Sequence, residues 1–127
     1  MTNQIDARAI LLGAGIFVVG CLILGGLSML AGESEADRRI VSGVTQVCGV
    51  LLPVVSGFAS AYFARAHPIL QGAIAGAIGA LPFIALSAMV VDSFPVWAVV
   101  LALAFFAFLS SFGAIFGSHL RAKRSPN

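Results

Sequence analysis

The positions of the charged residues constrain this chain more than any other feature of its sequence. Asp, Glu, Lys and Arg are absent from four long stretches, residues 9–32, 40–64, 66–91 and 93–120. A helix needs about 20 apolar residues to cross the hydrocarbon core of a bilayer, which is about 30 Å thick. Each stretch is long enough for one crossing and too short for two. The sequence therefore predicts an all-α, polytopic membrane protein with four antiparallel transmembrane helices in a bundle.

The amino-acid composition excludes several classes of soluble protein. Hydrophobic residues make up 60% of the 127-residue chain and charged residues only 9%, whereas charged residues are about 25% of a typical globular protein. Twelve charged side chains cannot cover the surface of a small soluble domain, and so much apolar sequence does not stay disordered. A net charge of +2 is too small to indicate nucleic-acid binding. We expect the lipid bilayer, and not a nucleic acid, as the main partner.

Helix-capping residues set the expected boundaries of a single domain, residues 1–127. The helices are expected at about residues 5–31, 35–64, 68–91 and 94–119. Asn3 is a candidate N-cap for the first helix. Ser34 and Asp37 resemble a capping box at the start of the second. His67-Pro68 predicts an extended turn followed by the first turn of the third helix, because the residue before proline is restricted and proline suits a helix start.

Pro53 and Pro82 fall near the middle of the second and third expected helices. A proline removes a backbone donor and disturbs the carbonyl four residues earlier, so we expect a kink at each. Some transporters use such breaks as binding sites. Neighbouring helices and hydroxyls also restore the lost bonding in many membrane helices, and we favour this second interpretation.

The distribution of Lys and Arg predicts the orientation. With four crossings, both termini and the turn after the second helix lie on one side. That side carries five basic residues, Arg8, Arg65, Arg121, Lys123 and Arg124, and the other side carries two, Arg38 and Arg39. The positive-inside rule then places both termini in the cytoplasm. Tyr62 and Trp97 fall near opposite membrane surfaces, where aromatic side chains act as interfacial anchors.

Three helices each carry a face of small or weakly polar residues. The candidates for helix packing or for a polar path are Gln46, Gly49, Pro53, Ser56, Ser60, Gly72, Gly76, Ser110 and Ser111. The segment from Gly72 to Gly76 is a literal GxxxG motif. The fourth helix also carries a bulky stripe, Trp97, Leu101, Phe105, Phe108, Phe112 and Phe116. In lipid, close backbone approach and polar contacts hold helices together, so we expect the small faces inward and the bulky stripe toward lipid or a partner.

None of the expected spans contains the chemistry of an enzyme or an ion-coupled transporter. Proton relays and small multidrug exporters need an ionisable residue at depth, and the spans have none. Gln46 is the strongest polar group there, and we interpret it as an interhelical hydrogen-bonding residue rather than a ligand contact. The serines lack a candidate base, and His67 and His119 lack further metal ligands. We expect no catalytic residue, no metal and no cofactor.

One pattern around the second turn is familiar. The segments Gly57–Arg65 and Leu70–Gly76 combine a Gly-aromatic-small helix end, a basic residue and a glycine-rich helix start. This arrangement resembles several uncharacterised families of small bacterial four-span inner-membrane proteins. Those families usually begin the motif with a Gly-Gly pair, where this chain has Ser56-Gly57. The resemblance implies a bacterial cytoplasmic-membrane location, and it implies no activity and no site residue.

The leading hypothesis from these observations is a non-enzymatic membrane protein that acts through helix–helix assembly. It would form a homo-oligomer or serve as an accessory subunit of a membrane complex. The alternative is a small transporter or channel with a polar path along the second helix, from Gln46 to Ser60. A holin-like pore former is a third hypothesis, suggested by the size of the chain and its basic C-terminal tail.

Overall fold

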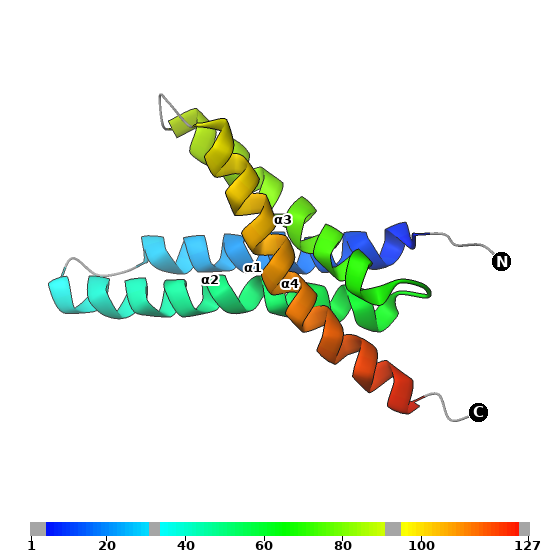
Figure 1. Cartoon of the computed structure of the whole chain (residues 1–127). Coiled ribbons are helices and arrows are strands. Elements are labelled where there is room, and N and C mark those ends of the chain that lie inside the picture. The colour runs from blue at the N-terminus through cyan, green and yellow to red at the C-terminus, as the bar shows by residue number, and fades with distance from the viewer. Residues whose placement is uncertain (1–4, 31–33, 91–94, 125–127) are drawn as a thin grey trace.

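In a computed structural model, which describes residues 5–30, 34–90 and 95–124, the chain folds into four α-helices. They are α1 (Ala7–Met29), α2 (Glu35–Phe63), α3 (Pro68–Val90) and α4 (Val96–Arg124) (Figure 1). No strand occurs in the part of the chain that the structure describes. All four helices are long and apolar enough to cross a membrane. The predicted all-α, four-helix fold is confirmed.

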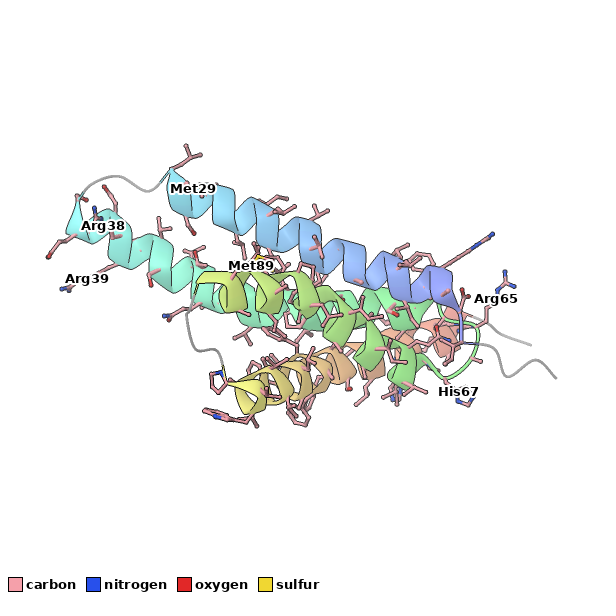
Figure 2. The ribbon with its side chains drawn as sticks, turned by 90° about the horizontal axis from the view of Figure 1, so that it is seen from above. Met29, Arg38, Arg39, Arg65, His67 and Met89 are labelled. Atoms are coloured by element: carbon pink, nitrogen blue, oxygen red, sulfur yellow. The ribbon has the colours of Figure 1, made fainter. Side chains whose placement is uncertain are left out.

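The helices form two antiparallel hairpins, α1–α2 and α3–α4, which cross each other (Figure 1). We call the end that holds the turn between α2 and α3 the base, and the opposite end the tip. The first turn of α1 and the last turn of α4 also lie at the base, and the two hairpins diverge toward the tip. Figure 2 shows Arg65 and His67 at the base and Arg38 and Arg39 at the tip.

The N-cap of the first helix and the end of the last helix differ from the prediction. The N-cap of α1 is Asp6, whose side chain accepts a hydrogen bond from the backbone N–H of Arg8 at 3.2 Å; Asn3, the expected cap, lies outside the described residues. The expected end of the last helix at residue 119 is wrong, because α4 continues to Arg124. Lys, Arg and Ala favour helix, and basic residues are favourable at a helix C-terminus. The helix therefore continues beyond its apolar part.

The start of α2 confirms half of the expected capping box. The Ser34 hydroxyl oxygen accepts from the backbone N–H of Asp37 at 3.1 Å and donates to the Asp37 carboxylate at 2.6 Å. In a complete box the N3 side chain would bond to the N-cap backbone N–H. Asp is one methylene shorter than Glu, and here it bonds to the hydroxyl instead.

The turn between α2 and α3 is tighter than expected. His67, which the sequence predicts to be extended, has a φ of 45° and lies in the left-handed region that non-glycine residues seldom adopt. Its carbonyl accepts from the backbone N–H of Gln71 at 3.0 Å and so begins the hydrogen bonding of α3. The expectation is wrong because the chain reverses direction between Phe63 and Pro68, and this reversal outweighs the usual preference of a residue before proline.

The backbones of α2 and α4 touch where the hairpins cross. A β-carbon added at Gly57 would lie against the carbonyl oxygen of Ser110, and one added at Gly113 would lie against the carbonyl oxygen of Val54. Only glycine allows two helix backbones to come this close. The crossing of the hairpins is therefore set by glycines on both of these helices.

An aromatic cluster fills the space beside this crossing on the tip side. Phe17 of α1 is buried together with Ala80 and Ile84 of α3. Its ring meets Phe106 edge-on at a centroid distance of 5.5 Å and Phe83 at 6.1 Å, an arrangement that aromatic pairs prefer. Side chains of α1, α3 and α4 thus meet at this one ring.

The predicted division of α4 into two faces is confirmed. Ser110, Ala114 and Gly117 are buried against the other helices. The bulky stripe points away from them, and its members Trp97, Leu101, Phe105, Phe108, Phe112 and Phe116 are all exposed. In a soluble protein an apolar stripe of this size would be buried, so it indicates contact with lipid or with another protein.

Replacing Gly57 with alanine should destabilise the protein by about 1–3 kcal/mol, because a methyl group there meets a backbone carbonyl that cannot move aside freely. Gly49→Ala is the matched control: nothing lies within 4 Å of its added β-carbon, and alanine is the better helix former by about 1 kcal/mol. Thermal unfolding in detergent, followed with a thiol-reactive dye on Cys21 and Cys48, measures both variants. Equal melting temperatures for Gly57→Ala and the wild type would contradict the backbone contact.

Candidate functional site

The nine candidate residues do not form one continuous polar path. Six of them are buried at or below the crossing, Pro53, Ser56, Ser60, Gly72, Gly76 and Ser110. Gly49 and Ser111 are half-buried, and Gln46 is exposed toward the tip. The stripe on α2 therefore passes from a packed interior near the base to an open surface near the tip.

Each hairpin is fastened by one hydrogen bond from a buried serine to a glycine carbonyl. The Ser56 hydroxyl donates to the Gly13 carbonyl at 2.8 Å, between α2 and α1, and the Ser110 hydroxyl donates to the Gly72 carbonyl at 2.7 Å, between α4 and α3. A glycine has no side chain to shield its carbonyl, so the hydroxyl of a neighbouring helix can reach it. These serines act as packing residues, as interhelical hydroxyls commonly do in membranes.

Gly13 was missed by the sequence analysis. A β-carbon added there would lie 2.7 Å from the Ser56 carbonyl oxygen and 2.8 Å from the Ser60 β-carbon, so this glycine is tightly packed against α2. The available signal was the spacing of Gly13 and Phe17, one helical turn apart. It was hidden because α1 is apolar on every side and its sequence shows no preferred face.

The GxxxG motif of α3 packs against α4 of the same molecule. A β-carbon added at Gly72 would lie 2.5 Å from the Ala114 β-carbon, and one added at Gly76 would lie 2.8 Å from the Phe106 carbonyl oxygen. Both neighbours belong to α4. This motif therefore holds the second hairpin together and is not a free surface for another chain.

Two polar side chains, Ser60 and Gln71, are buried near the base, and only Ser60 was among the candidates. Gln71 is fully buried, and its amide donates to the Ala66 carbonyl at 2.6 Å, which ties the start of α3 to the turn before it. Gln71 entered the sequence analysis only as part of the resemblance motif. Its Oε1 atom and the Ser60 hydroxyl are buried without a hydrogen-bond partner. Buried polar atoms of this kind weaken a fold.

Ser56 and Ser60 therefore make a matched pair of variants, since both are fully buried on one face of α2. Ser56→Ala should lower stability by about 0.5–1.5 kcal/mol through loss of its interhelical bond. Ser60→Ala should leave stability unchanged or raise it, because it removes an unpaired buried hydroxyl. Thermal unfolding of both variants in one detergent tests this. Equal losses would show that the serines matter for shape and not for hydrogen bonding.

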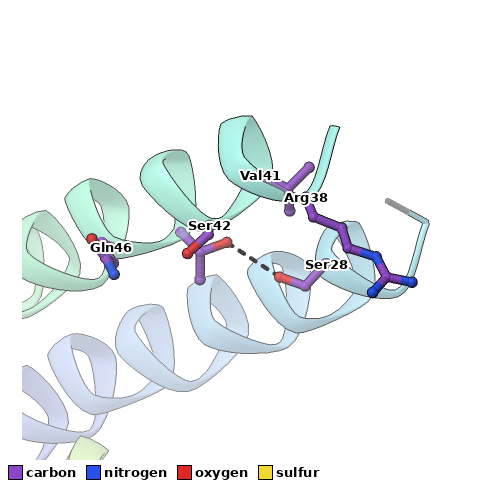
Figure 3. A pocket seen from close by; sticks show the side chains of 6 residues that line it. Ser28, Arg38, Val41, Ser42 and Gln46 are labelled. Atoms are coloured by element: carbon purple, nitrogen blue, oxygen red, sulfur yellow. Dashed lines mark hydrogen bonds between the residues drawn. The ribbon is translucent and has the colours of Figure 1, made fainter. Parts of the chain in front are cut away.

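A pocket of about 340 Å³, with several polar side chains in a largely apolar lining, lies at the tip between the last turn of α1 and the first half of α2 (Figure 3). It is lined by Ser28 of α1 and by Arg38, Val41, Ser42, Thr45 and Gln46 of α2. The pocket forms because α1 ends at Met29 while α2 continues outward. Gln46 was the only one of its lining residues among the candidates.

A pair of hydroxyls joins the two helices inside this pocket. The hydroxyl oxygens of Ser28 and Thr45 lie 3.2 Å apart, and the Ser28 hydroxyl donates to the Leu24 carbonyl at 2.8 Å. A hydroxyl has only one proton, so Thr45 must be the donor between the two. Both oxygens therefore keep lone pairs that can accept further hydrogen bonds.

Other reactive side chains are dispersed. Within residues 5–30, 34–90 and 95–124 no group of three His, Cys, Asp or Glu is placed to hold a metal ion. Cys21 and Cys48 are both free thiols. Asp6 and Arg65 approach to 4.0 Å at the base, with the arginine almost fully exposed, and such a pair contributes little stability.

The two expected anchors lie at opposite ends of the molecule. Tyr62 is the penultimate residue of α2, at the base, and its ring stacks on Phe58 at a centroid distance of 6.1 Å. Trp97 is in the first turn of α4, toward the tip, and is 66% exposed. This placement is the one that interfacial aromatic residues would need.

Comparison with models of known protein families, with curated proteins and with solved structures gave no match to this chain.

Proposed function

We propose that this chain is a non-enzymatic, multi-pass protein of the bacterial cytoplasmic membrane that acts through helix–helix assembly, with further copies of itself or as a subunit of a membrane complex. Four helices of spanning length and apolar character support insertion into a bilayer. The expected orientation has the base, with five basic residues against two at the tip, in the cytoplasm. Within that bilayer α2 and α3 bend at Pro53 and Pro82.

The observation that carries this proposal is the contrast between two sets of glycines. Eight of the thirteen glycines within the described residues would clash with a neighbouring segment if a β-carbon were added: Gly13, Gly20, Gly57, Gly72, Gly76, Gly79, Gly113 and Gly117. The other five meet nothing within 4 Å: Gly15, Gly25, Gly26, Gly43 and Gly49. All five lie on α1 or on the tip half of α2. Glycine in a helix interior costs about 1 kcal/mol relative to alanine, and here no contact inside the molecule offsets that cost.

Exposed apolar side chains surround these open glycines. Leu22 and Met29 of α1 and Val47 of α2 are each more than half exposed. Small residues between larger apolar ones allow two helices to approach closely in lipid, where packing rather than water drives association. The outer part of the α1–α2 hairpin therefore has the character of an association surface that one copy of the chain leaves unfilled.

Gly26→Leu should lower the oligomeric fraction without lowering monomer stability, because nothing lies within 4 Å of an added β-carbon but the side chain would block close approach of a partner helix. Ala104→Leu, which enlarges an exposed small residue of α4, is the matched control and should leave assembly unchanged. Blue-native electrophoresis and light scattering in a mild detergent measure the oligomeric state.

A wild-type chain that is strictly monomeric and purifies without a partner would contradict the proposed assembly. Equal oligomeric fractions for Gly26→Leu and Ala104→Leu would show that assembly, if present, uses another surface.

The tip pocket is the specific observation that favours the alternative of a transporter or channel, because Gln46 lines it. On the base side of the pocket, Pro53 and Ser56 are buried, and the Ser56 hydroxyl donates its hydrogen bond to the Gly13 carbonyl of α1. The polar path is thus open at one end and packed beyond it, which is why assembly is the better-supported function.

The two functions make different predictions for proteoliposomes. Under the assembly proposal, flux of small polar solutes should not exceed that of protein-free liposomes, because the packed segment of α2 leaves no path. A transporter would show flux that Gln46→Leu reduces at least tenfold, with Ser118→Ala as a control variant outside the pocket. Such flux would replace assembly with transport as the function.

A further inference from the structure

The difference in length between α1 and α2 fixes where the tip pocket would lie in a membrane. At about 1.5 Å per residue, the 29 residues of α2 span about 43 Å, against about 30 Å for the hydrocarbon core. The 23 residues of α1 span about 34 Å and end near the edge of that core. The first turns of α2 therefore extend into the head-group layer, and the pocket opens at the depth of the lipid phosphates.

Among the described residues that line it, the pocket combines one cation, Arg38, with several hydrogen-bonding groups. Arg38 forms no ion pair with Glu35 or Asp37 in the described chain, so its five N–H donors remain available. Figure 3 shows its side chain reaching from α2 toward the end of α1, beyond Ser28. Ser42 adds a hydroxyl to the same lining.

Other residues of the lining offer acceptors. Because the Ser28 proton is donated to Leu24 and the Thr45 proton to Ser28, the two oxygens present lone pairs to the pocket and have no proton left for an anion. Gln46 contributes an amide oxygen beside them. A ligand that fits needs an anionic group for Arg38 and N–H donors for this pair.

The geometry points to the head group of a phospholipid that carries a primary ammonium, with its phosphodiester on Arg38 and its ammonium on the Ser28–Thr45 hydroxyl pair. Val41 supplies an apolar wall within the pocket, and the neighbouring side chains Leu27 and Val44 are more than half exposed, so acyl chains have an apolar surface to follow. This inference rests on the proposed membrane insertion but not on the proposed assembly.

The test is a titration of the delipidated full-length protein in mild detergent, followed by native mass spectrometry. The probes are short-chain phosphatidylethanolamine, phosphatidylcholine and phosphatidylglycerol, with inorganic phosphate and free phosphoethanolamine as soluble controls. Phosphatidylethanolamine should bind about tenfold more tightly than phosphatidylcholine, whose trimethylammonium has no N–H, since one hydrogen bond to a charged group is worth about that factor. The soluble controls should bind at least tenfold more weakly than the lipid.

Three variants separate the contributions. Arg38→Gln should weaken all three lipids about tenfold, because it removes the charge-assisted bond to phosphate. Thr45→Val should abolish the preference for phosphatidylethanolamine over phosphatidylcholine. Arg39→Gln is the matched control, since Arg39 does not line the pocket, and it should bind like the wild type.

Specific outcomes would overturn the inference. Equal lipid affinities for Arg38→Gln and Arg39→Gln would exclude a phosphate site, and a lower melting temperature of Arg38→Gln without any lipid dependence would show that Arg38 only stabilises the C-terminal end of α1. Free phosphate binding as tightly as the lipid would exclude a lipid ligand.

The same preparation distinguishes failure of the assembly proposal from failure of the lipid-binding proposal. If the chain is monomeric but still prefers phosphatidylethanolamine, only the assembly proposal is contradicted. A chain that alkaline washing releases from membranes contradicts membrane insertion and overturns both.

Discussion

The direct contact between the α2 and α4 backbones is the constraint on which the rest of the structure depends. Gly57 and Gly113 bring each helix against a carbonyl of the other, and no side chain separates them. In lipid the gain from such contact is packing and polar interaction rather than the removal of water. The two hairpins are held at this point, with a serine-to-carbonyl hydrogen bond inside each, and they diverge beyond it.

The crossing creates two regions with different properties. Toward the base, small residues and hydroxyls interlock and leave little free surface. Toward the tip, within the described residues, α1 and the outer half of α2 pack against each other over several turns, and glycines, apolar side chains and the pocket at Ser28 and Arg38 remain open. The proposed association surface and the proposed lipid site both lie in this open region, next to the packed base.

The sequence predicted the parts of this fold that depend on spacing along the chain. The charge-free stretches fixed the number and approximate limits of the helices, and the phenylalanine spacing on α4 separated its exposed face from the face of Ser110. The spacing on α2 could not show that Ser56 is buried and Gln46 exposed, because that depends on where a second hairpin crosses it. Gly13 was missed because α1 is apolar all round, and Arg38 because the pocket draws on two helices of unequal length.

Two hairpins that cross at an angle cannot both run parallel to the normal of a bilayer (Figure 1). At least one of them would be tilted, and a tilted helix covers less of the bilayer thickness than its own length. The helices α2 and α4, with 29 residues each, are longer than a helix needs to cross upright. Both can therefore tilt and still reach the two membrane surfaces.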